Sequence, residues 1–204
     1  CPYSCFFYCT YPLQQGRKVR ARSVNNIIEE IKFWKKKLGT NKFVFRDPVF
    51  SINKKNTIEF CKQVIEQKLD ITFMVETHLN NLDNEMIKLL KLAGLRLVYV
   101  GVESASDFVL NDMKRFTVEH DKQYKVIKEC EDEGIKVKTM FIIGNPEDTR
   151  DTIIKSIEYS KYLPNLYTQF SVFTPYPGTP VYADFENIIY RWRRSRNRSA
   201  LAII

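Results

Sequence analysis

Short apolar runs alternate with longer amphipathic stretches along this sequence, and the alternation restricts the fold more than any other feature. Parallel strands need a crossover of about a dozen residues or more, so a repeated strand and helix pattern indicates an α/β fold with a parallel sheet. The expected strands cover residues 42–46, 71–75, 97–100, 137–143 and 167–173. The expected helices lie between Ser23 and Gly39, at about 56–68, between Asp83 and Gly94, and at about 107–115, 118–133 and 149–162.

The residues that follow the expected strands are informative, because right-handed crossovers bring the carboxyl ends of parallel strands to one face. In barrel-like α/β folds that face holds the active site. The strand ends, in chain order, are Asp47, Glu76, Glu103, Gly144 and Thr174. Each acid alone can be explained as a helix N-cap or a solvated loop residue. Three carboxylates in register favour the recognition of a polar ligand.

Three cysteines, Cys1, Cys5 and Cys9, open the chain in a segment that contains two prolines and ends at Gly16. Thiolates select zinc, copper(I) or iron–sulfur clusters. Three thiolates on one short loop can hold three corners of a four-iron cluster and leave the fourth iron open to a ligand. We therefore expect the segment to be a loop that ligates a cluster.

Other interpretations of the cysteines explain less. An odd number of cysteines cannot all form disulfides, and Cys61 and Cys130 fall inside expected helices without a matching spacing. A structural zinc site needs four ligands, and the only histidines, His78 and His120, are far away in the sequence. Three inert core cysteines remain an alternative, although a segment rich in proline and glycine is a poor place for them.

The basic charge of the chain comes mostly from its end. The formal net charge is +8, but five arginines between residues 191 and 198 supply most of it and leave residues 1–190 at +3, from 27 basic and 24 acidic residues. The tail shows no helical or strand periodicity, so disorder is expected there. The basic run 17–22 can contact phosphates, but a solvated loop is the favoured interpretation, and no RNA-binding aromatic motif accompanies it.

Length and hydropathy favour one domain. A chain of 204 residues can bury one substantial core. No stretch reaches the roughly 20 apolar residues that a membrane helix needs, and no signal-peptide pattern opens the chain. We therefore expect a cytoplasmic protein in a reducing environment, which suits thiolate ligands.

In combination, these parts resemble the radical S-adenosylmethionine superfamily, and most closely its cobalamin-binding type. The resemblance is carried by the cysteine segment with Tyr11-Pro12 and Gly16-Arg17-Lys18, and by the strand endings Gly101-Val102-Glu103-Ser104, Ile142-Ile143-Gly144-Asn145-Pro146 and Thr174-Pro175-Tyr176-Pro177-Gly178. It implies a partial (β/α)6 TIM-like barrel of parallel strands whose first strand is missing. Residues 1–188 would form the core domain, truncated at its N-terminus, and residues 189–204 a basic, disordered tail.

The resemblance implies that Cys1, Cys5 and Cys9 ligate a 4Fe-4S cluster and that Tyr8 packs on the adenine of S-adenosylmethionine. Further contacts to this cofactor would come from residues at the strand ends, namely Asp47, Glu76, Glu103, Ser104, Ile143, Gly144 and Thr174. A carboxylate at Asp47 suits the methionine ammonium, which needs an anionic partner. The acids after the next strands would reach the ribose hydroxyls or the sulfonium, and the later residues would support the adenine.

The implied activity is reductive cleavage of S-adenosylmethionine to a 5′-deoxyadenosyl radical that acts on a small-molecule or lipid substrate. An external electron donor of the flavodoxin or ferredoxin type is implied, and cobalamin would be bound by a domain outside this chain. The spacing departs from the family, which has two residues between its second and third cysteines where this chain has three. Two alternatives stay open, an iron–sulfur or metal-binding fragment without turnover and a tRNA-modifying radical enzyme, although nucleic acid is the less favoured partner.

Overall fold

The computed structural model of the chain describes residues 1–3 and 5–185. The expected boundary at residue 188 and the basic tail 189–204 lie outside the described residues. Five strands form one sheet in the order β1 (Lys42–Val44), β2 (Thr72–Thr77), β3 (Leu95–Glu103), β4 (Lys136–Ile143) and β5 (Tyr167–Val172). All neighbouring strands are parallel. This confirms the expected α/β class and is consistent with a partial TIM-like barrel.

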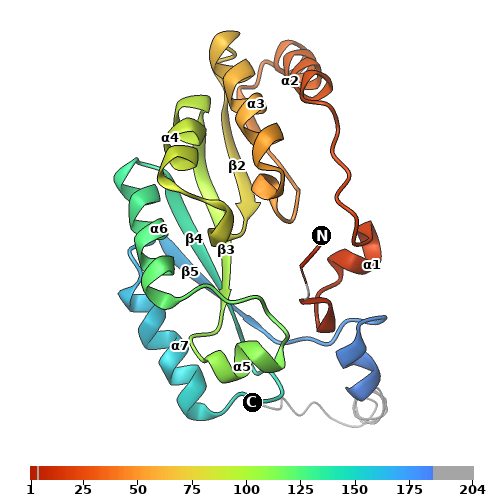
Figure 1. Cartoon of the computed structure of the whole chain (residues 1–204), viewed down its shortest axis with the longest axis vertical. Helices are drawn as coiled ribbons and strands as arrows, with labels where there is room; N and C mark the ends of the chain where they lie inside the picture. Colours follow the sequence, from red (N-terminus) through yellow and green to blue (C-terminus); the bar gives the residue numbers. More distant parts are fainter. Residues whose placement is uncertain (4, 186–204) are drawn as a thin grey trace.

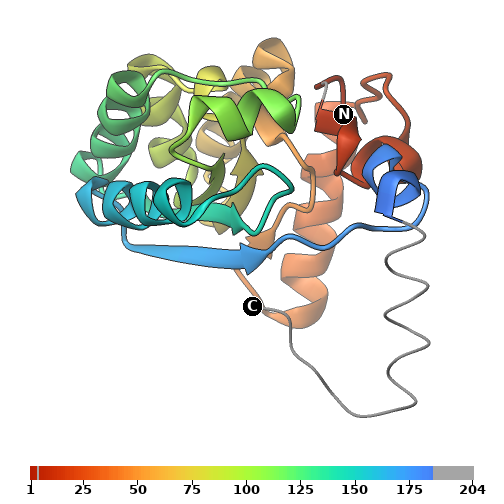
Figure 2. The ribbon, with the colours of Figure 1, turned by 90° about the horizontal axis from the view of Figure 1, so that it is seen from below.

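The helices connect the strands in the expected order. They are α1 (Tyr11–Gln15), α2 (Val24–Leu38), α3 (Lys54–Glu66), α4 (Asn84–Ala93), α5 (Asp107–Asp112), α6 (His120–Asp132) and α7 (Arg150–Tyr162). Short 3₁₀ turns cover η1 (Cys5–Phe7), η2 (Phe50–Ile52) and η3 (Leu79–Asn81). In Figure 1, α6 and α7 lie on one side of the sheet and α1 lies on the other, and Figure 2 shows the same separation from below. In the described part of the chain, no helix is both long and apolar enough to cross a bilayer.

Local capping explains where several helices begin and end. The Ser23 side chain accepts a hydrogen bond from the backbone of Asn26, as expected for an N-cap of α2, and Gly39 ends that helix in the left-handed conformation. The Asp83 side chain caps α4 in the same way. Gly94 ends α4 at φ +108°, and an added Cβ would lie 2.1 Å from the backbone oxygen of Ile71. Only glycine fits where α4 turns this closely into β3.

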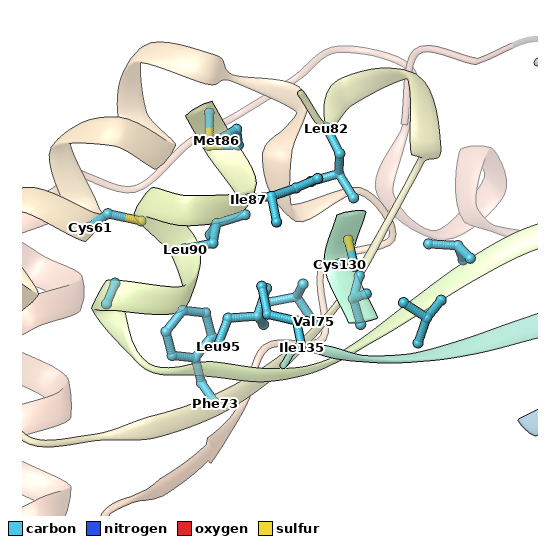
Figure 3. Packing of buried hydrophobic residues seen from close by; sticks show 14 of the residues in the cluster. Cys61, Phe73, Val75, Leu82, Met86, Ile87, Leu90, Leu95, Cys130 and Ile135 are labelled. Carbon is cyan, nitrogen blue, oxygen red and sulfur yellow. The ribbon is translucent and has the colours of Figure 1, made fainter. Parts of the chain in front are cut away.

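The core lies between the sheet and the helices α2, α3, α4 and α6. Figure 3 shows Cys61 of α3 and Cys130 of α6 among apolar side chains, close to Leu90 and Ile135. Burial raises the pKa of the Cys61 and Cys130 thiols to about 12, so both stay protonated at neutral pH. These two cysteines are therefore structural.

On α2 and α3, the apolar residues at helical spacing form a wider stripe than the part of each helix that is buried. Trp34, Leu38 and Ile65 recur at core spacing, but they are 37%, 64% and 38% exposed. Ile65 lies at the margin of the buried stripe of α3, whereas Cys61 and Val64 of the same helix belong to the core. A helix buries one stripe, and residues at its margin stay in water.

The two faces of the sheet differ in their cover. Buried and half-buried residues alternate along β2, β3 and β4. Val98, Val100 and Val137 belong to the core shared with the helices. Successive side chains of a strand point to opposite faces, so Tyr99 and Lys138 point away from that core. We call this opposite surface the open face; it carries Met74, Glu76, Tyr99, Lys138 and Tyr167.

Candidate active site

The cysteine segment is helical where a loop was expected. The backbone nitrogen of Cys9 donates to the oxygen of Cys5 at 3.1 Å, and η1 and α1 occupy much of the segment. Residues four apart lie on the same side of such a turn, so the two thiols meet and hydrogen-bond. Cys5 is buried at 5% exposure, whereas Cys1 and Cys9 are half-buried. The three-residue spacing between these cysteines is therefore accommodated by one turn of helix.

A buried ion pair lies against Cys5. Arg115, which follows α5, lies 3.5 Å from the Oε1 of Glu103, and its Nη1 lies 4.0 Å from the Cys5 sulfur. Its Nη2 also donates to the backbone oxygen of Gly101 at 3.0 Å. The guanidinium therefore links the carboxyl end of β3 to the cysteine segment.

The backbone at the end of β3 is shaped for this pair. The register of β3 against β4 shifts between Gly101 and Glu103, and Glu103 has φ +70°, a value that non-glycine residues rarely adopt. A Cβ on Gly101 would lie 2.2 Å from the Glu103 carboxylate and 3.0 Å from Arg115. A side chain at position 101 would have to displace the Glu103 carboxylate, so glycine leaves room for that carboxylate to turn toward the arginine, and the unusual φ of Glu103 points to a functional site.

The neighbouring groups shift the pKa values of the Cys5 and Cys9 thiols in opposite directions. The hydrogen bond from Cys9, helped by the charge of Arg115, lowers the pKa of the Cys5 thiol to about 6 although burial acts against it. The pKa of Cys9 is raised, because Cys9 donates to Cys5 and is itself buried. Burial raises the pKa of Glu103 against the attraction of Arg115. Cys5 is thus the thiolate of the pair at neutral pH, which is the form that binds metal.

Tyr8 and Tyr11 connect the segment to other parts of the site. The Tyr8 ring lies 6.5 Å from the ring of Phe173, just after β5, and burial raises the pKa of the Tyr8 hydroxyl. The Tyr11 side chain lies near the Glu76 carboxylate at the end of β2, and burial together with this charge raises the pKa of Tyr11. Glu76 also forms an ion pair of 3.3 Å with Arg46. Two of the expected strand-end acids, Glu76 and Glu103, therefore meet the cysteine segment.

Aromatic stacking fixes the start of the segment. Tyr3 stacks on His78 with ring centroids 4.9 Å apart, and its hydroxyl donates to Asn81 at 3.3 Å. Phe116 lies within 6.1 Å of Tyr3 and 5.6 Å of His78. Burial and the charge of Arg115 lower the pKa of His78 to about 4, so this imidazole is neutral at physiological pH.

The remaining expected site residues lie apart from the thiols. Asp47 is exposed at a groove of about 500 Å³ between α2 and β1. Ser104 is buried and hydrogen-bonds Ser156 of α7 at 3.3 Å, on the helix side of the sheet. Thr174 is exposed, and its hydroxyl donates to the Val172 oxygen at 3.2 Å.

The end of β4 approaches the end of β5. The backbone oxygen of Ile143 accepts a hydrogen bond from Phe173 at 2.8 Å, and Gly144 has φ +79°. Both residues thus lie beside the aromatic ring that faces Tyr8.

The cysteine thiols of this segment are chemically suited to an iron–sulfur cluster. Thiols next to a buried guanidinium are readily deprotonated, and cluster iron is held by thiolates. Cys5 and Cys9 are already together. Within residues 1–3 and 5–185, no three histidine, cysteine or acidic side chains are grouped closely enough to hold a metal ion, so Cys1 stands apart from the pair.

Arg115 is the site residue that sequence reasoning did not identify. It lies near the end of an expected helix, without any motif around it. No local pattern could have revealed it, because its partners, Cys5 and Glu103, come from other parts of the chain.

Comparisons with known proteins identify the family of the chain. Residues 1–160 match the family described as the radical SAM superfamily. The chain is 32% identical over 198 residues to the uncharacterized methyltransferase PH0819 of Pyrococcus horikoshii, covering 95% of this chain and 43% of that protein. It is 25% identical to the anaerobic magnesium-protoporphyrin IX monomethyl ester cyclase of Rubrivivax gelatinosus, covering 90% of this chain and 33% of the relative.

A solved structure has the same fold. The radical S-adenosylmethionine methyltransferase TsrM of Kitasatospora setae, determined with cobalamin and a 4Fe-4S cluster, superposes with a TM-score of 0.84. Its sequence is 19% identical, and the match covers 92% of this chain and 38% of TsrM. The chain thus spans less than half the length of each of these proteins.

Proposed function

The chain belongs to the radical SAM superfamily, and we propose that it forms the core of an enzyme that binds a 4Fe-4S cluster and cleaves S-adenosylmethionine. The observation that carries the proposal is the position of the cysteine segment at the carboxyl ends of β2 and β3, where Cys5 lies beside Arg115 and Tyr11 lies near Glu76. Cys1, Cys5 and Cys9 are the proposed ligands. Cys1 has to approach the Cys5–Cys9 pair when the cluster binds.

The chain's own residues would hold and shield the reacting groups. When bound, the cluster supplies the electron that breaks a sulfonium carbon–sulfur bond, giving a 5′-deoxyadenosyl radical. Arg115 stabilises the Cys5 thiolate, and the half-buried rings of Tyr8 and Phe173 offer an apolar surface to the adenine. Excluding water there protects a reactive radical from side reactions.

The strand-end residues are the proposed binding groups for S-adenosylmethionine. Glu76 and Glu103 would accept hydrogen bonds from ribose hydroxyls, and Asp47 would accept the methionine ammonium. Ser104, Ile143, Gly144 and Thr174 complete the proposed set. Ser104 supports this set from behind the sheet through its contact with Ser156.

The proposed reaction is a group transfer with cobalamin held by a domain outside this chain, because TsrM is a methyltransferase bound to cobalamin and PH0819 is called a methyltransferase. The substrate would be a small molecule or lipid, and an external flavodoxin- or ferredoxin-type protein would deliver the electron. The reducing cytoplasm is the proposed location, since it keeps the thiols free.

Anaerobic iron–sulfur reconstitution followed by electron paramagnetic resonance of the reduced protein tests this function. We expect a 4Fe-4S signal that changes when S-adenosylmethionine is added, together with formation of 5′-deoxyadenosine. A cluster signal that is indifferent to S-adenosylmethionine would contradict the proposal.

A second candidate is cluster binding without turnover. The separation of Cys1 from the other two cysteines favours it, as does the additional residue between Cys5 and Cys9. This candidate predicts bound iron but no 5′-deoxyadenosine, so the same experiment distinguishes the two functions.

A further inference from the structure

A row of cross-strand neighbours crosses the open face of the sheet. Glu76 of β2 pairs with Tyr99 of β3, Tyr99 pairs with Lys138 of β4, and Lys138 pairs with Tyr167 of β5. Arg46 extends the row through its ion pair with Glu76. Directly opposite residues in a sheet have side chains within contact distance, so the row is continuous from beyond β1 to β5.

Lys138 lies between two aromatic rings in this row. Its Nζ is 4.5 Å from the ring centroid of Tyr99 and 5.4 Å from that of Tyr167. The Tyr167 hydroxyl lies near that of Tyr99, and Tyr167 is 42% exposed. The rings hold the ammonium in one place while one side of the group remains open to solvent.

Among the described residues, the row from Arg46 to Tyr167 carries one positive charge without an acid partner, that of Lys138. Glu76 is paired with Arg46, and Glu103 is paired with Arg115. Lys136, two residues earlier on β4, is paired with Glu131 of α6 at 3.0 Å. Lys138 takes part in none of the ion pairs formed among residues 1–3 and 5–185.

Packing alone does not require a charge at this position. Met140 follows on the same face of β4, and a methionine at 138 would also fill the space between two rings with favourable sulfur–aromatic contacts. An ammonium held by aromatic rings, with hydroxyl groups beside it, instead offers several donors to an anion.

We propose that Lys138, with Tyr99 and Tyr167, binds the anionic group of the substrate, a carboxylate or a phosphate of a small organic molecule. This inference rests on the proposed function, because it places the substrate on the face that the cysteine segment adjoins. Tyr11 of that segment lies near Glu76, which belongs to the same row. An anion on Lys138 would orient the rest of the substrate across the open face.

The test is a nuclear magnetic resonance titration of the chain without cluster or S-adenosylmethionine, using benzoate, phenyl phosphate and neutral benzyl alcohol as probes. We expect at least one anion to shift the ring signals of Tyr99 and Tyr167, while benzyl alcohol does not. The relative affinity for benzoate and phenyl phosphate then distinguishes a carboxylate from a phosphate. A wild-type chain that binds neither anion at these rings would overturn the inference.

Three variants make the test specific. Lys138→Met keeps the packing and should weaken anion binding by about tenfold or more, because a hydrogen bond to a charged group contributes about 1.5–3 kcal/mol. Lys138→Arg keeps the charge and should retain binding. Lys136→Met is the matched control on the same strand and should bind as the wild type does. Equal binding by Lys138→Met and the wild type would refute the assignment.

The outcome does not depend on catalysis. Anion binding at Lys138 without 5′-deoxyadenosine formation would refute the proposed function and leave the anion site intact. Formation of 5′-deoxyadenosine by a chain that binds no anion there would refute only the anion site.

Discussion

Arg115 lies 3.5 Å from the Glu103 carboxylate, and both side chains are only 12% exposed. A charge pair this far removed from water is costly to break, because the remaining partner stays buried without compensation. The pair also fixes the position of the guanidinium beside the Cys5 sulfur. Its integrity therefore couples the stability of the chain to the geometry of the candidate active site.

Replacing Arg115 with methionine should lower the free energy of unfolding by about 3 kcal/mol, since Glu103 is left as an unpaired buried carboxylate. Urea denaturation measures the change. The Lys161→Met variant, which removes the exposed pair with Glu158, is the control and should change the free energy by less than about 1 kcal/mol. The double variant Arg115→Met with Glu103→Gln should recover part of the loss, and no recovery would mean that the pair is not the cause.

Gly101→Ala should destabilise the chain by about 1–3 kcal/mol, because the new methyl group collides with the Glu103 carboxylate. The same substitution in a Glu103→Ala background should cost less, since the colliding atoms are gone. Denaturation of the four chains gives the coupling energy between the two positions. Additive effects would contradict the proposed close contact.

Stability should depend on pH through His78. Its pKa in the folded chain is about 4, below the ordinary value of 6.5, because burial and the charges of Arg115 and Lys122 outweigh a hydrogen bond to the backbone of Phe116. Between these pH values the unfolded chain binds more protons, so the free energy of unfolding falls as the pH drops. We expect a loss of about 2 kcal/mol from pH 7 to pH 5. The His78→Phe variant should lose less over this range, and an unchanged slope would refute the assignment.

Cys5→Ala should abolish the brown absorbance of the reconstituted cluster, because one of three proposed ligands is removed. Cys61→Ala is the matched control, since Cys61 lies in the core and burial keeps its thiol protonated. Iron content per chain, measured after anaerobic reconstitution, reports both effects. Equal iron in the two variants would show that Cys5 is not a ligand.

Much of the fold could be predicted because its signals are local. The alternation of strands and helices fixed the order of the elements, and the caps at Ser23 and Asp83 marked helix starts that the structure confirms. Strand ends were less certain. The expected strand 97–100 extends as β3 from Leu95 to Glu103, because pairing with two neighbouring strands lengthens it beyond its apolar run.

The sequence by itself determined the parallel α/β class, the cysteine segment and the strand-end acids, since these depend on residue type and spacing along the chain. Only the tertiary structure decided which of them meet. It brought Glu76 and Glu103 to the cysteine segment, left Asp47 at a separate groove and turned Ser104 toward α7. Arg115 and the row through Lys138 arise from the pairing of distant strands and loops, and contacts of that kind have no periodicity that a single segment could display.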